Sequence, residues 1–142
     1  MLDVGCGSGI LAIGALHLGA KEAIGVDIDP ASEKISAENA AINGFGCDRY
    51  RGFTGDVIQS SEVRMRLGSG WDVVAANIVA GVILPLTPYV PQFIKRGGYF
   101  VISGIYYERL PEVEAALRDN GFVVEEILRD KDWAGLRTRY MP

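Results

Sequence analysis

The segment Asp3–Gly9 (DVGCGSG) constrains the fold of this chain more than any other stretch. A short apolar strand ends in an acid, and glycines then stand at every second position: Gly5, Gly7 and Gly9. The apolar run Ile10–Leu16 follows at once and predicts a helix. A strand, a glycine loop and a helix in this order build the nucleotide sites of α/β proteins. A tight turn without a ligand needs one glycine rather than three, so we expect a ligand to lie against this backbone.

Two better-known glycine motifs do not fit the loop. A phosphate loop ends in Gly-Lys-Ser/Thr, whereas Gly9 is followed by Ile10. The dinucleotide fingerprint G-x-G-x-x-G needs a glycine at Ile10, which disfavours a nicotinamide-dependent dehydrogenase. The remaining pattern, D-x-G-x-G-x-G, resembles the first motif of the S-adenosylmethionine-dependent methyltransferases with the Rossmann-like fold. That cofactor carries no phosphate, which agrees with the absence of a lysine clamp.

A second acid ends the next predicted strand, Ala23–Asp27. Asp27 lies about twenty residues beyond the loop, where an acid accepts hydrogen bonds from both ribose hydroxyls of a bound nucleoside. Asp29 competes for this role, but Asp27 ends the apolar run directly, and Asp29 with the proline after it is typical of a helix start. Ile28 is placed to pack against the base.

A third acid follows the weak predicted strand Arg49–Phe53, within a Thr-Gly-Asp-Val sequence. The methyltransferase fold usually places at this point a group that recognises the adenine amino group. The resemblance therefore implies that Asp56 accepts that hydrogen bond and that Val57 supplies its backbone N–H. An acidic turn residue without a ligand is the alternative for Asp56.

A polar residue ends the fourth predicted strand, Trp71–Asn77, whose nearly continuous apolar run is typical of a parallel strand covered on both faces. Ligands bind at the carboxyl ends of such strands. Asn77 is placed to bind a substrate amine or the methionine end of the cofactor. Capping of the next helix is the competing role for Asn77.

The remaining elements alternate in the same way. We expect a short helix or loop over 60–70 and a turn over 95–98. Further helices are predicted over 31–43, 82–94 (interrupted by Pro85 and Pro88) and 108–120, and further strands over 99–105, 122–128 and 133–140. The short polar connection 129–132 predicts that the last two strands pair antiparallel. The pattern predicts the α/β class and matches the Rossmann-like, seven-stranded, mostly parallel sheet with one antiparallel strand and helices on both faces.

Three further segments narrow the resemblance to one family. Asn77–Ala80, Ser103–Ile105 and the pair Asp132-Trp133 resemble the bacterial enzymes that methylate a large-subunit ribosomal protein on amino groups, the PrmA type. The resemblance implies methyl transfer from S-adenosyl-L-methionine to a lysine side chain or an N-terminal amine of a ribosomal protein, with Asn77 orienting the amine. It implies these cofactor-binding residues: Asp3, Gly5, Gly7, Gly9, Asp27, Ile28, Asp56, Val57 and Asn77.

The sequence after Asn77 also bears on the substrate. Enzymes that methylate planar nitrogens typically carry prolines and an aromatic residue here, whereas this chain has Ile78, Val79 and Ala80. An sp³ amine fits better than a flat base. Another small-molecule or RNA amine, or a cofactor-binding module without activity, remain the alternatives.

Composition limits the other classes of function. The 142 residues and 49% hydrophobic content predict one domain, 1–142, and the net charge of −4 argues against direct nucleic-acid binding. Cys6 and Cys47 are expected to be free thiols, and a single histidine, His17, disfavours a metal site. We expect a cytoplasmic protein without a membrane segment. Members of the family carry a substrate-recognition domain before the first motif, so we expect that domain upstream of Met1.

Overall fold

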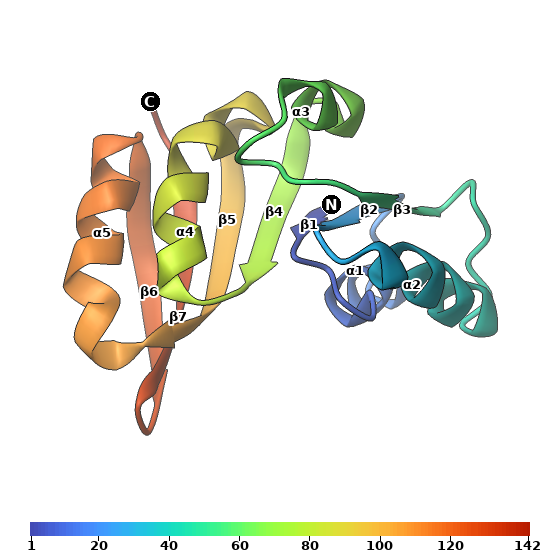
Figure 1. Cartoon of the computed structure of the whole chain (residues 1–142). Helices are drawn as coiled ribbons and strands as arrows, with labels where there is room; N and C mark the ends of the chain where they lie inside the picture. Colours follow the sequence, from blue (N-terminus) through green and yellow to red (C-terminus); the bar gives the residue numbers. More distant parts are fainter. The chain divides into compact units, whose positions relative to one another are not determined.

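The computed structural model describes all residues, 1–142, and they form two compact units (Figure 1). The first unit is Met1–Gly68 and the second is Ser69–Pro142. Every residue singled out above for the cofactor, except Asn77, belongs to the first unit. Asn77 and the Asp132-Trp133 pair belong to the second.

The first unit alternates strands and helices along the chain. Its elements are β1 (Leu2–Val4), α1 (Ile10–His17), β2 (Ala23–Asp27), α2 (Pro30–Ile42), β3 (Tyr50–Thr54) and α3 (Ser61–Leu67). The strands pair in parallel in the order β3-β2-β1, which the intervening helices make possible. The register places Asp3 beside Gly25 and Asp27 beside Thr54. The three strands therefore bring their carboxyl ends, and the residues that follow them, to one edge.

The core of the first unit lies between its helices and its strands. Helices α1 and α2 pack against each other and against β2 (Figure 1). The central buried residues are Ala12, Ile13, Leu16, Ala23, Ala40 and Tyr50. Small alanines on both helices allow this close approach, and Tyr50 supplies the largest buried side chain of the cluster. The hydroxyl group of this tyrosine lies near the glycine loop, as described below.

The second unit contains four strands with helices over one face (Figure 1). Its elements are β4 (Trp71–Asn77), α4 (Ala80–Leu86), η1 (Thr87–Gln92), β5 (Ile94–Tyr106), η2 (Tyr107–Arg109), α5 (Leu110–Asp119), β6 (Phe122–Asp130) and β7 (Trp133–Tyr140). The order is β4-β5-β7-β6, with β4 parallel to β5 and β7 antiparallel to both of its neighbours. The buried side chains Phe93, Phe100, Ile102 and Leu117 belong to its core.

The predicted fold class is confirmed. Seven strands are present, they are mostly parallel, and β7 is the one antiparallel strand. Strands β2, β4 and β7 have the predicted bounds. The antiparallel hairpin of β6 and β7 is likewise as predicted. The structure contains no helix that is both long enough and apolar enough to cross a bilayer.

The largest differences from the prediction are in two elements. The single helix expected over 82–94 is two shorter ones, α4 and η1, because Pro85 and Pro88 interrupt the hydrogen-bond pattern of a continuous α-helix. The turn expected over 95–98 lies inside β5, which begins at Ile94. The pairing between β4 and β5 is irregular there, with a register shift between Trp71 and Val73, so the glycine pair sits in a distorted strand rather than in a loop.

Candidate functional site

The glycine loop has the left-handed backbone that its sequence predicts. Gly5, Gly7 and Gly9 have φ values of 75°, 50° and 82°. The Gly5 N–H donates to the Val26 carbonyl at 2.8 Å, which fixes the loop to β2. Helix α1 starts directly after Gly9, and no side chain caps it. The first N–H groups of α1 are therefore available to a ligand at the loop.

Three buried side chains support the loop from below. The Tyr50 hydroxyl donates to the Cys6 sulfur at 4.0 Å, and Ser36 is buried beside them. A Cβ on Gly25 would lie 2.9 Å from the Cys6 Sγ and would collide with the Tyr50 hydroxyl, whereas a Cβ on Gly9 would lie 3.0 Å from the Ser36 Cβ. Burial raises the pKa of Cys6 to about 11, so its thiol stays protonated and serves packing rather than nucleophilic chemistry.

Asp3 is buried beneath the loop without a hydrogen-bond partner. It is 1% exposed, and neither of its carboxylate oxygens is paired. Burial raises the pKa of Asp3 to about 6; the Ala12 amide, outside hydrogen-bond geometry, partly offsets this rise, and the nearby charge of Asp27 adds to it. An unpaired buried carboxylate is costly for folding. Groups of this kind gather at functional sites, where a ligand compensates the cost.

Asp27 connects β2 to the loop. Its Oδ2 accepts the Gly7 N–H at 2.9 Å and its Oδ1 accepts the Asp29 N–H at 3.0 Å. Each oxygen of a carboxylate has a second lone pair, so Asp27 still has acceptor sites for a ligand. Asp29 caps α2 by accepting the Ala31 N–H at 2.9 Å, with proline at the first helical position, as predicted. Ile28 is 72% exposed between these two acids.

Asp56 and Val57 follow β3 in the same unit. The Gly55 N–H donates to the Asp27 carbonyl at 2.8 Å, which links this segment to β2. The Oδ1 of Asp56 accepts two backbone N–H groups, from Ile58 at 2.8 Å and from the residue after it at 3.0 Å. Asp56 therefore stabilises a turn through its Oδ1, and its Oδ2 remains available to a ligand. Val57 is buried.

Asn77 ends β4 in the second unit and is exposed. It pairs in register with Ser103 of β5. A Cβ on Gly104, whose φ is 81°, would lie 3.0 Å from the Asn77 Oδ1. The capping role considered for Asn77 is not found, because Val79 is the N-cap of α4 and no side chain caps that helix. The Asn77 amide is thus free of the helix end.

Two residues of α2 that the sequence did not single out also hold the site. Glu33 accepts the Thr54 N–H at 2.8 Å and the Thr54 hydroxyl at 2.6 Å, which ties α2 to the end of β3. Asn39 donates to the Ser8 carbonyl at 2.9 Å and so holds the glycine loop from the side. A charged or polar residue on a helix face carries no sequence signal for such long-range contacts.

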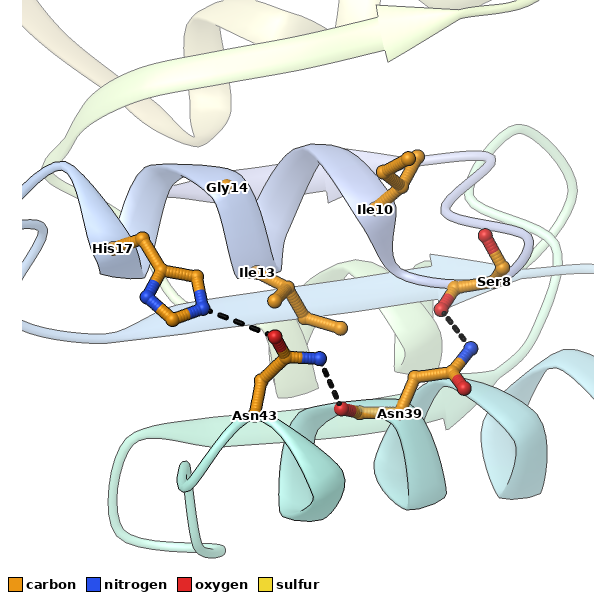
Figure 2. A pocket seen from close by; sticks show the side chains of 7 residues that line it. All are labelled: Ser8, Ile10, Ile13, Gly14, His17, Asn39 and Asn43. Carbon is orange, nitrogen blue, oxygen red and sulfur yellow. Dashed lines mark hydrogen bonds between the residues drawn. The ribbon is translucent and has the colours of Figure 1, made fainter.

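A pocket of about 390 Å³ lies between α1 and α2 (Figure 2). Figure 2 shows a series of hydrogen bonds along it, from His17 to Asn43, from Asn43 to the Asn39 carbonyl, and from Asn39 to Ser8. His17 also contacts the edge of the Phe45 ring, with centroids 4.8 Å apart. His17 therefore acts as a helix-to-helix contact. Of the predicted site, only the loop position Ser8 borders this pocket.

Comparison with known proteins identifies the family. The family described as ribosomal protein L11 methyltransferase (PrmA) matches residues 1–140. The chain belongs to this family. The resemblance drawn from the motifs is thereby confirmed, and the match covers nearly all of the residues described here.

Individual relatives agree with this assignment. The ribosomal protein L11 methyltransferase of Lachnoclostridium phytofermentans is 40% identical over 150 residues, which cover 96% of this chain and 45% of that protein. The crystal structure of a ribosomal protein L11 methylase from Lactobacillus delbrueckii subsp. bulgaricus has a TM-score of 0.88 and 34% identity, covering 99% of this chain and 69% of that one. The chain spans less than half the length of this curated relative.

A more distant structure shares the fold alone. It is an RNA methyltransferase from Salinibacter ruber in complex with S-adenosyl-L-homocysteine, with a TM-score of 0.73 and 20% identity. The alignment covers 99% of this chain and 79% of the other. The Rossmann-like methyltransferase fold therefore extends over the whole chain.

Proposed function

We propose that this chain binds S-adenosyl-L-methionine at the Asp3–Gly9 loop and transfers its methyl group to an amino group of a ribosomal protein. The acceptor is a lysine side chain or the N-terminal amine. Membership of the L11 methyltransferase family supports the reaction and the protein substrate. The partner is therefore ribosomal protein L11 or its equivalent, and the compartment is the cytoplasm, where ribosomes are assembled.

One observation carries the proposal for the cofactor: the buried, unpaired carboxyl group of Asp3 beneath three glycines with positive φ. The cofactor is cationic at its sulfonium and at its ammonium group and has no phosphate. A positive charge above the loop stabilises the carboxylate form of Asp3. A Cβ on Gly7 would meet open space, so a ligand has room beside this backbone.

The nucleoside half of the cofactor meets residues after β2 and β3. The free lone pairs of Asp27 accept both ribose hydroxyls, while its existing bonds to Gly7 and Asp29 keep the carboxylate oriented. The exposed side chain of Ile28 packs against the base. Asp56, through its Oδ2, and the Val57 N–H recognise the adenine edge. The proposed cofactor contacts involve acidic residues of the first unit and no other charged residue.

The bound cofactor supplies an activated methyl group together with its own leaving group, so the protein mainly positions the acceptor. The amine attacks through its lone pair, and a protonated amine must first lose a proton to water, since no side chain is assigned as a base. The Asn77 carbonyl oxygen accepts an amine N–H and thereby orients that lone pair. Holding two reactants in line contributes about 7–11 kcal/mol in favourable cases.

Calorimetric titration with S-adenosyl-L-homocysteine tests the cofactor site. We expect Asp27→Asn to weaken binding at least tenfold, because charge-assisted hydrogen bonds to the ribose are lost. Asp29→Asn is the matched control: it changes the neighbouring acid, keeps a good helix cap, and leaves affinity within about twofold. Equal losses in both variants would contradict the assignment of the ribose to Asp27.

The transfer itself is tested with labelled S-adenosyl-L-methionine and purified ribosomal protein L11. We expect label in L11 with the wild-type chain and at least tenfold less with Asn77→Ala. Because the chain spans about 45% of the curated relative, the alternative is a cofactor-binding unit without activity. Cofactor binding without any labelled L11 would establish that alternative.

A further inference from the structure

Gly104 lies beside Asn77 at the carboxyl end of β5. It directly follows Ser103, which is the in-register partner of Asn77 on β4. Its φ of 81° is in the left-handed region, which residues with a side chain rarely adopt. No step of the proposed methyl transfer uses this glycine, so its place next to Asn77 calls for an explanation.

Gly104 is part of a β-bulge. On one side of it Ile102 pairs with Leu136 of β7, and on the other side Ile105 pairs with Ala134. Two residues of β5 therefore oppose a single residue of β7. A glycine in the left-handed conformation is typical of one class of such bulges, and bulges often lie beside functional sites, where they redirect a side chain.

The extra residue also serves the core of the second unit. Side chains alternate between the two faces of a strand, so residues 102 and 105 would point to opposite faces of a regular strand. In the structure Ile102 is 1% exposed and Ile105 is fully buried. The burial of both isoleucines accounts for a bulge at this point. It does not account for the close approach of β4 to Gly104.

The end of β4 approaches Gly104 on the side where other residues carry their Cβ. A Cβ at position 104 would lie 3.0 Å from the Asn77 Oδ1 and 3.3 Å from the Ile78 carbonyl oxygen. Both distances are shorter than an ordinary van der Waals contact. The Asn77 amide oxygen therefore takes up space that is available only because residue 104 has no side chain.

Packing, rather than hydrogen bonding, determines where the Asn77 amide lies. The structure contains no hydrogen bond to or from this side chain, and α4 begins at the N-cap Val79 without it. The acceptor lone pairs of the Asn77 Oδ1 are therefore available to an incoming amine. Because Asn77 is exposed, an added side chain at position 104 would push its amide aside rather than be excluded by it.

We infer that Gly104 is a positioning residue for methyl transfer: its missing side chain leaves the space in which the Asn77 amide oxygen meets the acceptor amine. The task of Asn77 in this inference rests on the proposed function. A side chain at position 104 displaces the amide and slows the transfer. The affinity for the cofactor changes little, because the assigned cofactor residues other than Asn77 belong to the first unit.

The variant Gly104→Ala tests this inference, with Gly97→Ala as the matched control. Gly97 is in the same strand and has a φ of 78°, so alanine meets the same backbone strain there, but no atom lies within 4 Å of its Cβ. We expect Gly104→Ala to lower the kcat for methylation of ribosomal protein L11 about tenfold or more, because small displacements of a reacting group are costly. The KM for L11 and the affinity for S-adenosyl-L-homocysteine should stay within about threefold. Gly97→Ala should keep the wild-type kcat.

Two further measurements separate positioning from a loss of stability. In a chain that already carries Asn77→Ala, the change Gly104→Ala should lower kcat no further, because the amide that it displaces is gone. NMR spectra of the side-chain amides give a readout that needs no activity. The Asn77 signal, identified by its absence in Asn77→Ala, should shift in Gly104→Ala and stay in place in Gly97→Ala.

The outcomes separate this inference from the proposed function. An unshifted Asn77 signal in Gly104→Ala overturns the inference, and so does a loss of kcat that is equally large with and without the Asn77 side chain. No methylation of L11 by the wild-type chain overturns the proposed function; a shifted Asn77 signal then still supports positioning by Gly104, and an unshifted one overturns it. Should Gly104→Ala not fold, Gly104→Asn decides by the same criteria, since asparagine tolerates a positive φ better than other residues with a side chain.

Discussion

Asp3 is the residue whose burial conflicts most with its charge. Its pKa in the folded chain is about 6, against about 3.8 for an exposed aspartate. Between these values the native state holds a proton that the unfolded state releases, so stability falls as pH rises from about 4 to about 6. At 1.36 kcal/mol per pKa unit, the loss from this one group is about 3 kcal/mol. Urea unfolding of the ligand-free chain at pH 4.5 and pH 7 should detect it.

The substitution Asp3→Asn isolates this effect. An amide stays neutral at every pH, so we expect the variant to lose the decline that Asp3 causes and to be more stable than the wild type at pH 7. The same variant should bind the cofactor more weakly, because the compensating carboxylate is gone. Asp48→Asn, a change at an exposed acid, is the control and should retain the wild-type decline. If the stability of Asp3→Asn fell with rising pH as much as that of the wild type, the decline would not come from Asp3.

Gly25 is the residue where a single methyl group should disturb the loop most. In Gly25→Ala the new Cβ meets the Cys6 sulfur and the Tyr50 hydroxyl, and both are buried. Overpacking of this kind costs about 1–3 kcal/mol. We expect a lower melting temperature, with part of the loss recovered in the double variant Gly25→Ala/Tyr50→Phe, which lacks the hydroxyl. Gly14→Ala, where a Cβ has open space, is the control and should not destabilise the chain.

The contacts beneath the glycine loop could not be predicted from the sequence. The three glycines and the two acids at Asp3 and Asp27 were predicted because their spacing along the chain is short and regular. Tyr50 reaches Cys6 across forty-four positions, a contact set by the pairing of β3 with β2. A tyrosine in a weakly apolar strand gives no sign that its hydroxyl will fill the space above a glycine.

At the scale of elements, the N-cap of α2 makes a contribution to stability that can be measured. Asp29 accepts the Ala31 N–H, and a missing cap of this kind costs about 1 kcal/mol. We expect Asp29→Ala to lower the free energy of unfolding by that amount and Asp29→Ser to restore most of it. Cofactor affinity should stay within about twofold in both variants. A tenfold loss of affinity in Asp29→Ser would mean that Asp29, rather than Asp27, contacts the ribose.

The elements predicted best from the sequence are those with polar or charged residues at their ends. Strand β2 lies between a polar turn and an acid, and β7 follows a charged connection, so their bounds were predicted correctly. The helix after β4 was not, because a periodic apolar pattern does not show whether prolines kink or divide a helix. The glycine pair before Tyr99 suggested a turn. Residues 95–98 pair in register with neither neighbouring strand, but β5 continues through them.

At the scale of the whole molecule, the amine that receives the methyl group is the least constrained part of the proposal. Family membership supports a ribosomal protein substrate, and the residues after Asn77 favour an sp³ amine over a flat base. Neither distinguishes a lysine side chain from an N-terminal amine. The two differ in basicity, with pKa values of about 10.4 and about 8. That difference gives a measurement that identifies the acceptor.

Only the neutral amine can attack, and no side chain is assigned as a base, so kcat/KM should follow the neutral fraction of the acceptor. For a lysine, kcat/KM rises about tenfold per pH unit from pH 7 to beyond pH 9. For an N-terminal amine, the rise ends near pH 8 and a plateau follows. L11 with a blocked N-terminus is the matched substrate: it keeps the lysine-dependent rise and loses the plateau-forming activity. A rate independent of pH over this range would show that the site itself removes the proton, and would require a base that the present assignment lacks.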